Sequence, residues 1–207
     1  MNAAERLFAE RGFEHTSTHL ITRVAGVNQA AVNYHFGTKD RLIEEVVRRR
    51  LSPVSQKILT NLQLIETEAV GTGLRPKTED VLHAFIEPLF KMKDAFCDGR
   101  IFFAIAGRAF AEQDNAIQNI FKNYYQPVLS VVLRLLKKSM PDFPDRLLYF
   151  RIHFAFGAVT HTMSLLGREW LMDDFPRPPY NEEEVLKGLS RFIVAGIKSI
   201  DQIVEQE

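Results

Sequence analysis

Apolar side chains recur at a spacing of three to four residues along almost the whole chain, the period of amphipathic helices packed around a core. No stretch shows the sustained alternation of β-branched residues that is typical of a half-buried strand. The pattern predicts nine helices, at about residues 3–12, 17–25, 29–36, 39–66, 79–96, 99–112, 115–139, 145–172 and 182–206. The predicted fold class is therefore all-α.

Turn and cap residues support these boundaries. Gly12 and Gly26 end the first two helices, since glycine is the usual residue just past a helix C-terminus. Thr16 or Ser17 can cap the second helix, and Thr38 can cap the fourth, because their hydroxyl oxygens accept from free backbone N–H groups. Glycines and prolines predict a loop at 68–78 and a break at 173–181. Asn181 is placed to cap the last helix.

The segment "NQAAVNYHF", residues 28–36, carries hydrogen-bonding side chains with small residues between them. On a helix, Val32 and Phe36 lie four residues apart on one face, which we expect to face the core. Gln29, Ala30, Asn33 and Tyr34 lie on the other side. Amides can donate to and accept from base edges, especially those of adenine, and small residues allow close approach in the major groove. The pattern indicates a DNA-reading helix, although an ordinary exposed helix would also fit it.

The helix before this segment and the tight turn "AGVN" complete a predicted helix-turn-helix. Phosphate contacts are expected from Thr16, Ser17, Tyr34, His35 and Lys39. Lys39 lies in the first turn of a helix, where backbone N–H groups also attract anions. The full set of predicted DNA-contacting residues is Thr16, Ser17, Asn28, Gln29, Ala30, Asn33, Tyr34, His35 and Lys39.

Residues 3–47 also resemble the N-terminal domain of the TetR family of bacterial transcriptional regulators. The resemblance rests on an ordered set of elements: Leu7-Phe8, Gly12-Phe13, Thr16-Ser17, Ile21, Ala25-Gly26-Val27, His35-Phe36, Lys39 and Leu42. Family members usually carry tyrosine where Asn33 stands, and the variant "NYHF" is similar to a subgroup that includes fatty-acid-responsive regulators. The family also generally has a basic arm before the first helix; here Met1 lies inside the motif, so no arm contacts are predicted.

The resemblance implies a DNA-binding domain at 1–47 and a helical ligand-binding and dimerisation domain at 48–207. It further implies a homodimer that binds a palindromic operator and is released by a small molecule. Two halves of a dimer can read two half-sites about one helical turn apart, or a multiple of that distance. The apolar helices at 145–172 and 182–206 carry small residues suited to close packing in a dimer interface, although a monomer could use the same faces for its core.

Composition places few limits on this interpretation. The chain has 26 Lys and Arg against 26 Asp and Glu, with eight against six in residues 1–50, so bulk charge does not point to nucleic acid. A single cysteine, Cys97, excludes an internal disulfide and suits a reducing compartment. No signal peptide or membrane-spanning run is recognisable. We therefore expect a cytoplasmic protein without membrane contact.

Aromatic side chains are dense between residues 85 and 156, as expected either for core packing or for the lining of an apolar pocket. Arg108 interrupts an apolar run, and it is exposed, bonded to a helix carbonyl or placed to meet an anionic ligand, since a buried charge is costly unless paired. His153 and His161 are eight residues apart on one helix face, without a third ligand at metal-binding spacing. The predicted ligand-binding residues are Phe103, Arg108, Phe121, Tyr125, His153 and His161.

These features favour a ligand-responsive DNA-binding repressor with an apolar or amphipathic effector, and the subgroup resemblance implies a fatty acid or its thioester. Neither a glycine-rich phosphate loop nor a nucleophile elbow nor a His-Glu-x-x-His set is present, so no enzyme, cofactor or metal is predicted. The alternative is a carrier of lipids or other hydrophobic ligands. That function would leave "NQAAVNYHF" without a role, and salt-sensitive, sequence-specific DNA binding distinguishes the two.

Overall fold

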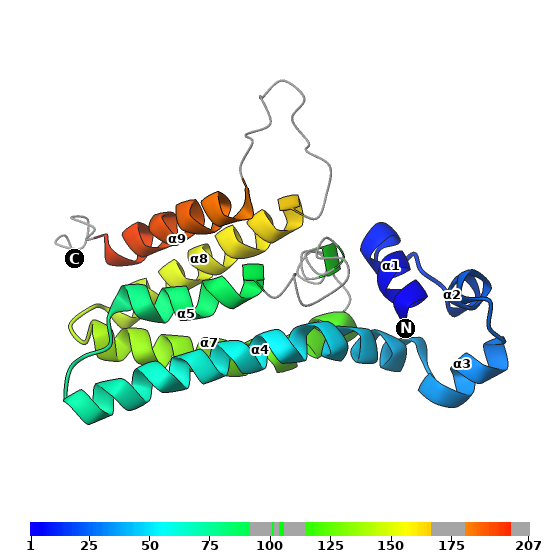
Figure 1. Cartoon of the computed structure of the whole chain (residues 1–207), viewed down its shortest axis with the longest axis horizontal. Coiled ribbons are helices and arrows are strands. Elements are labelled where there is room, and N and C mark those ends of the chain that lie inside the picture. The colour runs from blue at the N-terminus through cyan, green and yellow to red at the C-terminus, as the bar shows by residue number, and fades with distance from the viewer. Residues whose placement is uncertain (92–100, 102–103, 106–114, 167–180, 200–207) are drawn as a thin grey trace, which may run out of the picture.

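A computed structural model describes residues 1–91, 101, 104–105, 115–166 and 181–199. The described part is helical and contains no strand, which confirms the all-α prediction (Figure 1). Its helices are α1 (Asn2–Arg11), α2 (Thr18–Ala25), α3 (Gln29–Phe36), α4 (Lys39–Thr72), α5 (Thr78–Lys91), α7 (Asn115–Ser139), α8 (Asp145–Leu166) and α9 (Glu182–Lys198). None of the described helices is long and apolar enough to cross a membrane.

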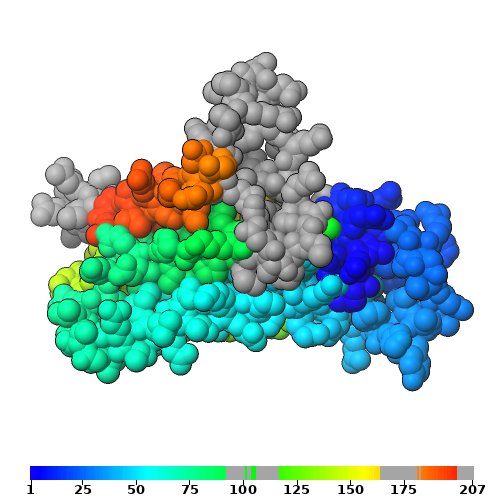
Figure 2. All heavy atoms as spheres, viewed as in Figure 1, coloured from blue at the N-terminus to red at the C-terminus, as the bar shows by residue number. Residues whose placement is uncertain are grey.

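The molecule is elongated because α4, with 34 residues, runs along its length. Helices α1 to α3 gather at one end of α4, and α5 and α7 pack against the rest of it (Figure 1). Helices α8 and α9 pack against each other, and α9 also contacts α5. Figure 2 shows the first three helices, in blue, as a distinct mass at one end of the molecule. A single helix thus connects this end to the remaining bundle.

Three helices begin at capping residues that the sequence predicts. Ser17, rather than Thr16, caps α2 by accepting from the backbone N–H of Leu20. Thr38 caps α4 by accepting from Arg41 N–H. Asn181 caps α9 in a capping box, in which its side chain accepts from Glu184 N–H and the Glu184 carboxylate accepts from Asn181 N–H.

Two helix ends differ from the prediction. Helix α4 continues to Thr72, six residues past the predicted end, and terminates at Gly73, whose φ of 69° is left-handed. The first five residues of the predicted loop at 68–78 are therefore helix, and residues 73–77 are not. Helix α9 ends at Lys198, short of the predicted end at 206, and Arg151 of α8 donates to the backbone carbonyls of Ile197 and Ser199 at this end. The predicted helix at 99–112 lies mostly outside the described residues, as do the predicted ends at 96 and 172.

The described apolar side chains form two cores that meet along α4 and α7. The larger core joins α4, α5, α7, α8 and α9. The smaller core holds α1 and α2 against the first turns of α4, and Ile117 and Phe121 of α7 belong to it. Phe121 is 1% exposed and its ring meets that of Phe13 edge-on at 6.0 Å. The end formed by α1 to α3 therefore shares its core with the rest of the bundle.

A buried ion pair also fixes α1 on α4. The carboxylate of Glu5 accepts from the guanidinium of Arg50, and both residues are buried, at 1% and 6% exposure. Arg49, which is nearly half exposed, contributes a second contact, 3.3 Å from Nη1 to the other carboxylate oxygen. Removing one member of a buried pair leaves the other charge uncompensated, and this lowers the stability of the fold much more than replacing both members does.

We predict that Glu5→Ala lowers the free energy of unfolding by about 3–5 kcal/mol, because Arg50 then stays buried without its main counter-charge. Urea denaturation followed by circular dichroism measures this loss. The double variant Glu5→Leu/Arg50→Met should lose less than the single one, since it buries no lone charge. A single variant as stable as the wild type would show that the pair does not hold α1 on α4.

Candidate DNA-binding surface and cavity

Helices α2 and α3 form a tight helix-turn-helix with a turn of three residues. Gly26 adopts a left-handed conformation, with φ 65° and ψ 30°, and Val27 N–H donates to the carbonyl of Thr22. Asn28 then caps α3 by accepting from Ala30 N–H at 2.9 Å. Few residues other than glycine adopt this backbone conformation, so Gly26 fixes the direction in which α3 leaves α2.

The outer face of α3 presents side chains to solvent. Val32 and Phe36 pack against the smaller core, as the sequence pattern predicts. Ala30, Asn33 and His35 are exposed, and Tyr34 is 88% exposed. A large side chain held this far from the protein contributes little to folding. The face thus has the small, amide and aromatic groups that major-groove contact requires.

Thr16 and Gln29 are placed differently from the rest of the predicted DNA-contacting set. Thr16 is fully buried, and its hydroxyl lies 2.7 Å from the carbonyl of Gly12 and 3.2 Å from that of Leu7. The prediction of a phosphate contact by this side chain is therefore wrong, since the hydroxyl serves the turn after α1. Gln29 is partly buried and its amide contacts Thr18 and Thr22 of α2.

Ser17, at the start of α2, and Lys39, at the start of α4, retain hydrogens that can be donated to an anion. The Ser17 oxygen accepts from Leu20 N–H at 3.1 Å, so its hydroxyl hydrogen can still be donated. The Lys39 ammonium donates to the carbonyl of Glu14 at 3.2 Å, which positions it between the turn after α1 and the start of α4. A lysine ammonium carries three hydrogens, so two remain for phosphate oxygens.

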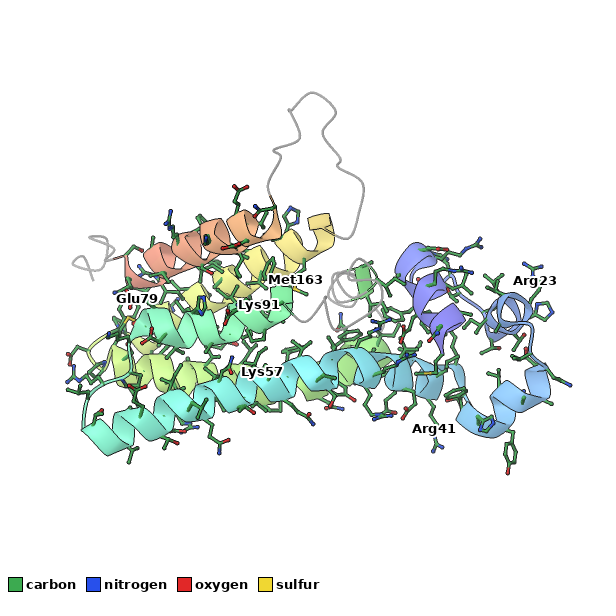
Figure 3. The ribbon with its side chains drawn as sticks, viewed as in Figure 1. Arg23, Arg41, Lys57, Glu79, Lys91 and Met163 are labelled. Atoms are coloured by element: carbon green, nitrogen blue, oxygen red, sulfur yellow. The ribbon has the colours of Figure 1, made fainter. Side chains whose placement is uncertain are left out.

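The sequence prediction did not include Arg23 and Arg41, two exposed arginines near the helix-turn-helix. Arg23 lies in the last turn of α2, and Arg41 lies in the first turn of α4, where Figure 3 shows it pointing away from the bundle. Exposed arginines in or beside a helix-turn-helix suit phosphate contact, so their residue type could have suggested these two positions. They could not be distinguished from other surface cations in the sequence alone.

A cavity of about 60 Å³ lies between α4, α5, α7 and α8. Its lining comprises eight apolar side chains and four that carry hydroxyls: Leu51, Val54, Ile58, Phe85, Leu89, Val128, Phe156 and Met163, with Ser55, Tyr124, Tyr125 and Thr160. The ring centroids of Tyr125 and Phe156 lie 5.5 Å apart, with the ring planes tilted by 40°. Burial raises the pKa of Tyr124, and the nearby Glu44 carboxylate adds to this effect, so its hydroxyl stays protonated at neutral pH.

Of the predicted ligand-binding residues, Tyr125 lines this cavity. Phe121 does not, because it is buried in the smaller core beside Phe13. His153 and His161 do not line it either, since both side chains are exposed on α8. Helix α8 is apolar on both faces, so its sequence does not reveal which face is inward. Phe103 and Arg108 lie outside the described residues.

Large apolar side chains are exposed on α8 and on α9, two helices that pack against each other. Phe154 is 71% exposed and Phe192 of α9 is 69% exposed, with Tyr149 and Phe150 also exposed on α8. Large apolar side chains exposed together on two packed helices are unusual in a monomer and indicate an interaction site. We refer to Tyr149, Phe150, Phe154 and Phe192 as the α8–α9 face.

Two family models match the chain. The model described as bacterial regulatory proteins, tetR family, matches residues 1–46, and the tetracyclin repressor-like C-terminal domain matches residues 83–196. No curated protein is similar enough in sequence to match.

Solved structures with the same fold include several regulators. The fatty acid degradation regulator FadR from Bacillus halodurans has a TM-score of 0.65 at 15% identity, with 94% of this chain and 96% of that chain covered. The TetR family transcriptional regulator PfmR from Thermus thermophilus has a TM-score of 0.55 at 17% identity, with coverages of 95% and 97%. The ketosteroid transcriptional regulator KstR2 of Mycobacterium tuberculosis has a TM-score of 0.57 at 17% identity, with coverages of 96% and 93%. At these identities the likeness shows the fold alone.

We predict that Arg41→Met weakens binding to duplex DNA of any sequence and reduces the slope of log affinity against log salt concentration by about 1 for each subunit that contacts the DNA, because each subunit loses one phosphate contact and its released counterion. Fluorescence anisotropy over a salt series measures the slope. Lys57→Met is the matched control, since Lys57 is exposed in the middle of α4, far from α3 (Figure 3). Equal slopes for Arg41→Met and the wild type would place Arg41 outside the DNA contact.

Proposed function

Because the chain belongs to the TetR family of bacterial regulators, and is accordingly a DNA-binding transcriptional regulator, we propose that it is a repressor. In this proposal it reads a palindromic operator as a homodimer and is released by a small apolar or amphipathic effector. The domain boundary at 47/48 is part of the same proposal, although it falls within the continuous helix α4. The family is one of regulators, so we propose no catalytic activity, and we place the protein in the cytoplasm with its DNA.

The observation that carries the DNA-reading role is the exposed face of α3. Asn33 and Tyr34 extend from a helix whose start is fixed by Asn28 and whose back is anchored by Val32 and Phe36. The groups that would meet the bases are thus held on a rigid element. Ser17, His35, Lys39 and Arg41 surround them with donors suited to phosphate oxygens.

The α8–α9 face supports the homodimer. Two copies that join through this face would bury four aromatic side chains from each subunit in a symmetric contact, as closed dimers require. Gly157, Gly188 and Gly196 on the same two helices have open space where a side chain would stand, which allows helices of a partner to approach closely. A dimer presents two α3 helices, and so can read two half-sites.

The cavity supports an apolar or amphipathic effector. Its lining is mostly apolar, with hydroxyls that can orient one polar group. FadR and KstR2, which share the fold, are a fatty acid degradation regulator and a ketosteroid regulator, which is consistent with apolar effectors, including a fatty acid or its thioester, for this chain. Ligand sites usually occupy about 300–1,000 Å³, so the present cavity must widen to admit such a compound.

Widening the cavity would strain the core beneath α1 to α3. Leu51, Tyr124 and Tyr125 line the cavity and also pack against the smaller core. Phe121 lies one helical turn before Tyr125 and contacts Phe13. A compound that separates α4 from α7 therefore shifts the supports of the recognition helix. It releases DNA only if it binds this shifted arrangement more tightly than the DNA-bound one.

The test is binding of purified protein to the DNA upstream of its own gene, compared with a nonspecific duplex by gel shift. We expect saturable binding to the upstream DNA. Asn33→Ala should weaken this binding on the order of tenfold or more, which corresponds to the loss of one good base contact. Asn123→Ala is the matched control, since Asn123 is exposed on α7. Equal affinity for both duplexes at low salt would contradict the proposal and favour a hydrophobic-ligand carrier.

A further inference from the structure

The side-chain amide of Gln29 is enclosed by two hydroxyls of the preceding helix. Its Nε2 lies 3.1 Å from Thr18 Oγ1, and its Oε1 lies 3.1 Å from Thr22 Oγ1. Gln29 is the first residue of α3 and is partly buried, whereas Asn28 and Ala30 on either side of it are exposed. The amide therefore has a fixed position between α2 and α3.

Thr22 is the more rigid of the two threonines. It is 4% exposed, and its hydroxyl also lies 2.9 Å from the carbonyl of His19, one turn earlier in α2. A hydroxyl has one hydrogen, so it can donate to His19 or to Gln29, but not to both. With the amide as placed, Thr22 donates to Oε1 and Nε2 donates to Thr18 Oγ1. If Thr22 donates to the His19 carbonyl instead, the amide turns by 180°, so that its N–H donates to Thr22 and its oxygen accepts from Thr18. In either arrangement the two hydroxyls engage one N–H and one oxygen lone pair of the amide.

The amide keeps hydrogen-bonding capacity for DNA. It has two N–H donors and two oxygen lone pairs, and the threonines engage one of each. One donor and one acceptor remain, which is the combination that pairs with N7 and N6 of adenine in the major groove. The first residues of a recognition helix are those that contact base edges. A glutamine already held in place also loses less side-chain entropy when it binds a base.

We propose that Thr18 and Thr22 are positioning residues that orient the Gln29 amide to read an adenine in each half-site. This proposal rests on operator reading as proposed above. Thr22 acts through Gln29, since its side chain is buried. Loss of the Thr22 hydroxyl should therefore change the base preference at one position of each half-site and leave the preference at the other positions unchanged.

The experiment is selection of the full-length protein on a random duplex DNA library, with the selected sequences read for the wild type and each variant. For Gln29→Ala we expect loss of an A·T preference at one position per half-site. For Thr22→Val, which removes the hydroxyl at nearly constant volume, we expect that same preference to fall on the order of tenfold. Thr22→Ser, which retains the hydroxyl, should restore it.

Thr18→Val is the second variant, because Thr18 is less buried and its replacement disturbs the core less. Thr67→Val is the matched control: its exposed hydroxyl donates to the carbonyl one turn earlier on α4, away from the helix-turn-helix. A base preference that falls at all positions alike in these variants, or one that is unchanged in both Thr18→Val and Thr22→Val, would overturn the inference while leaving the regulator proposal intact. A wild type that selects no motif would overturn the proposed operator reading itself.

Discussion

The contact between Phe13 and Phe121 joins the two parts of this molecule. Phe13 follows α1, Phe121 lies on α7, and both rings are buried in one core with the first turns of α4. Close-packed cores transmit displacement because they contain few voids to absorb it. The end that carries the recognition helix therefore cannot take a position independent of α4 and α7. The proposed release of DNA by an effector depends on that constraint.

Two interactions of different kinds reinforce the constraint. The buried pair of Glu5 and Arg50 fixes α1 on α4 by charge, and Leu51, the next residue, lines the cavity. The threonines that hold Gln29 fix α3 on α2 by hydrogen bonds. The cavity is thus connected to the outer face of α3 through α4 and α7, through the Glu5–Arg50 pair, and through the hydrogen bonds of Gln29. This arrangement suits a regulator, in which a small change in the bundle must move a whole recognition surface.

Local features were predictable from the sequence, and features set by packing were not. The order of helices, the caps at Thr38 and Asn181 and the outward face of α3 follow from short-range chemistry. The burial of Thr16 does not, because it depends on how the turn after α1 folds back. The exposure of His153 and His161 depends on which face of a doubly apolar helix lies toward the bundle. Phe121 was assigned to a pocket for the same reason, since an aromatic residue in a core and one in a cavity look alike in sequence.

We infer that the cavity and the α1–α3 end respond as one unit, and hydrogen exchange of the Ser55→Leu variant can test this coupling without an effector. The larger side chain overfills the cavity from α4 and replaces the effector, whose identity is then not needed. Val128→Ala, which lowers stability without filling the cavity, and Ser130→Leu, on the exposed side of α7, are the controls. We predict faster amide exchange in α1 to α3 for Ser55→Leu than for either control. A change confined to the helices around the cavity, with α1 to α3 unaltered, would contradict the claim.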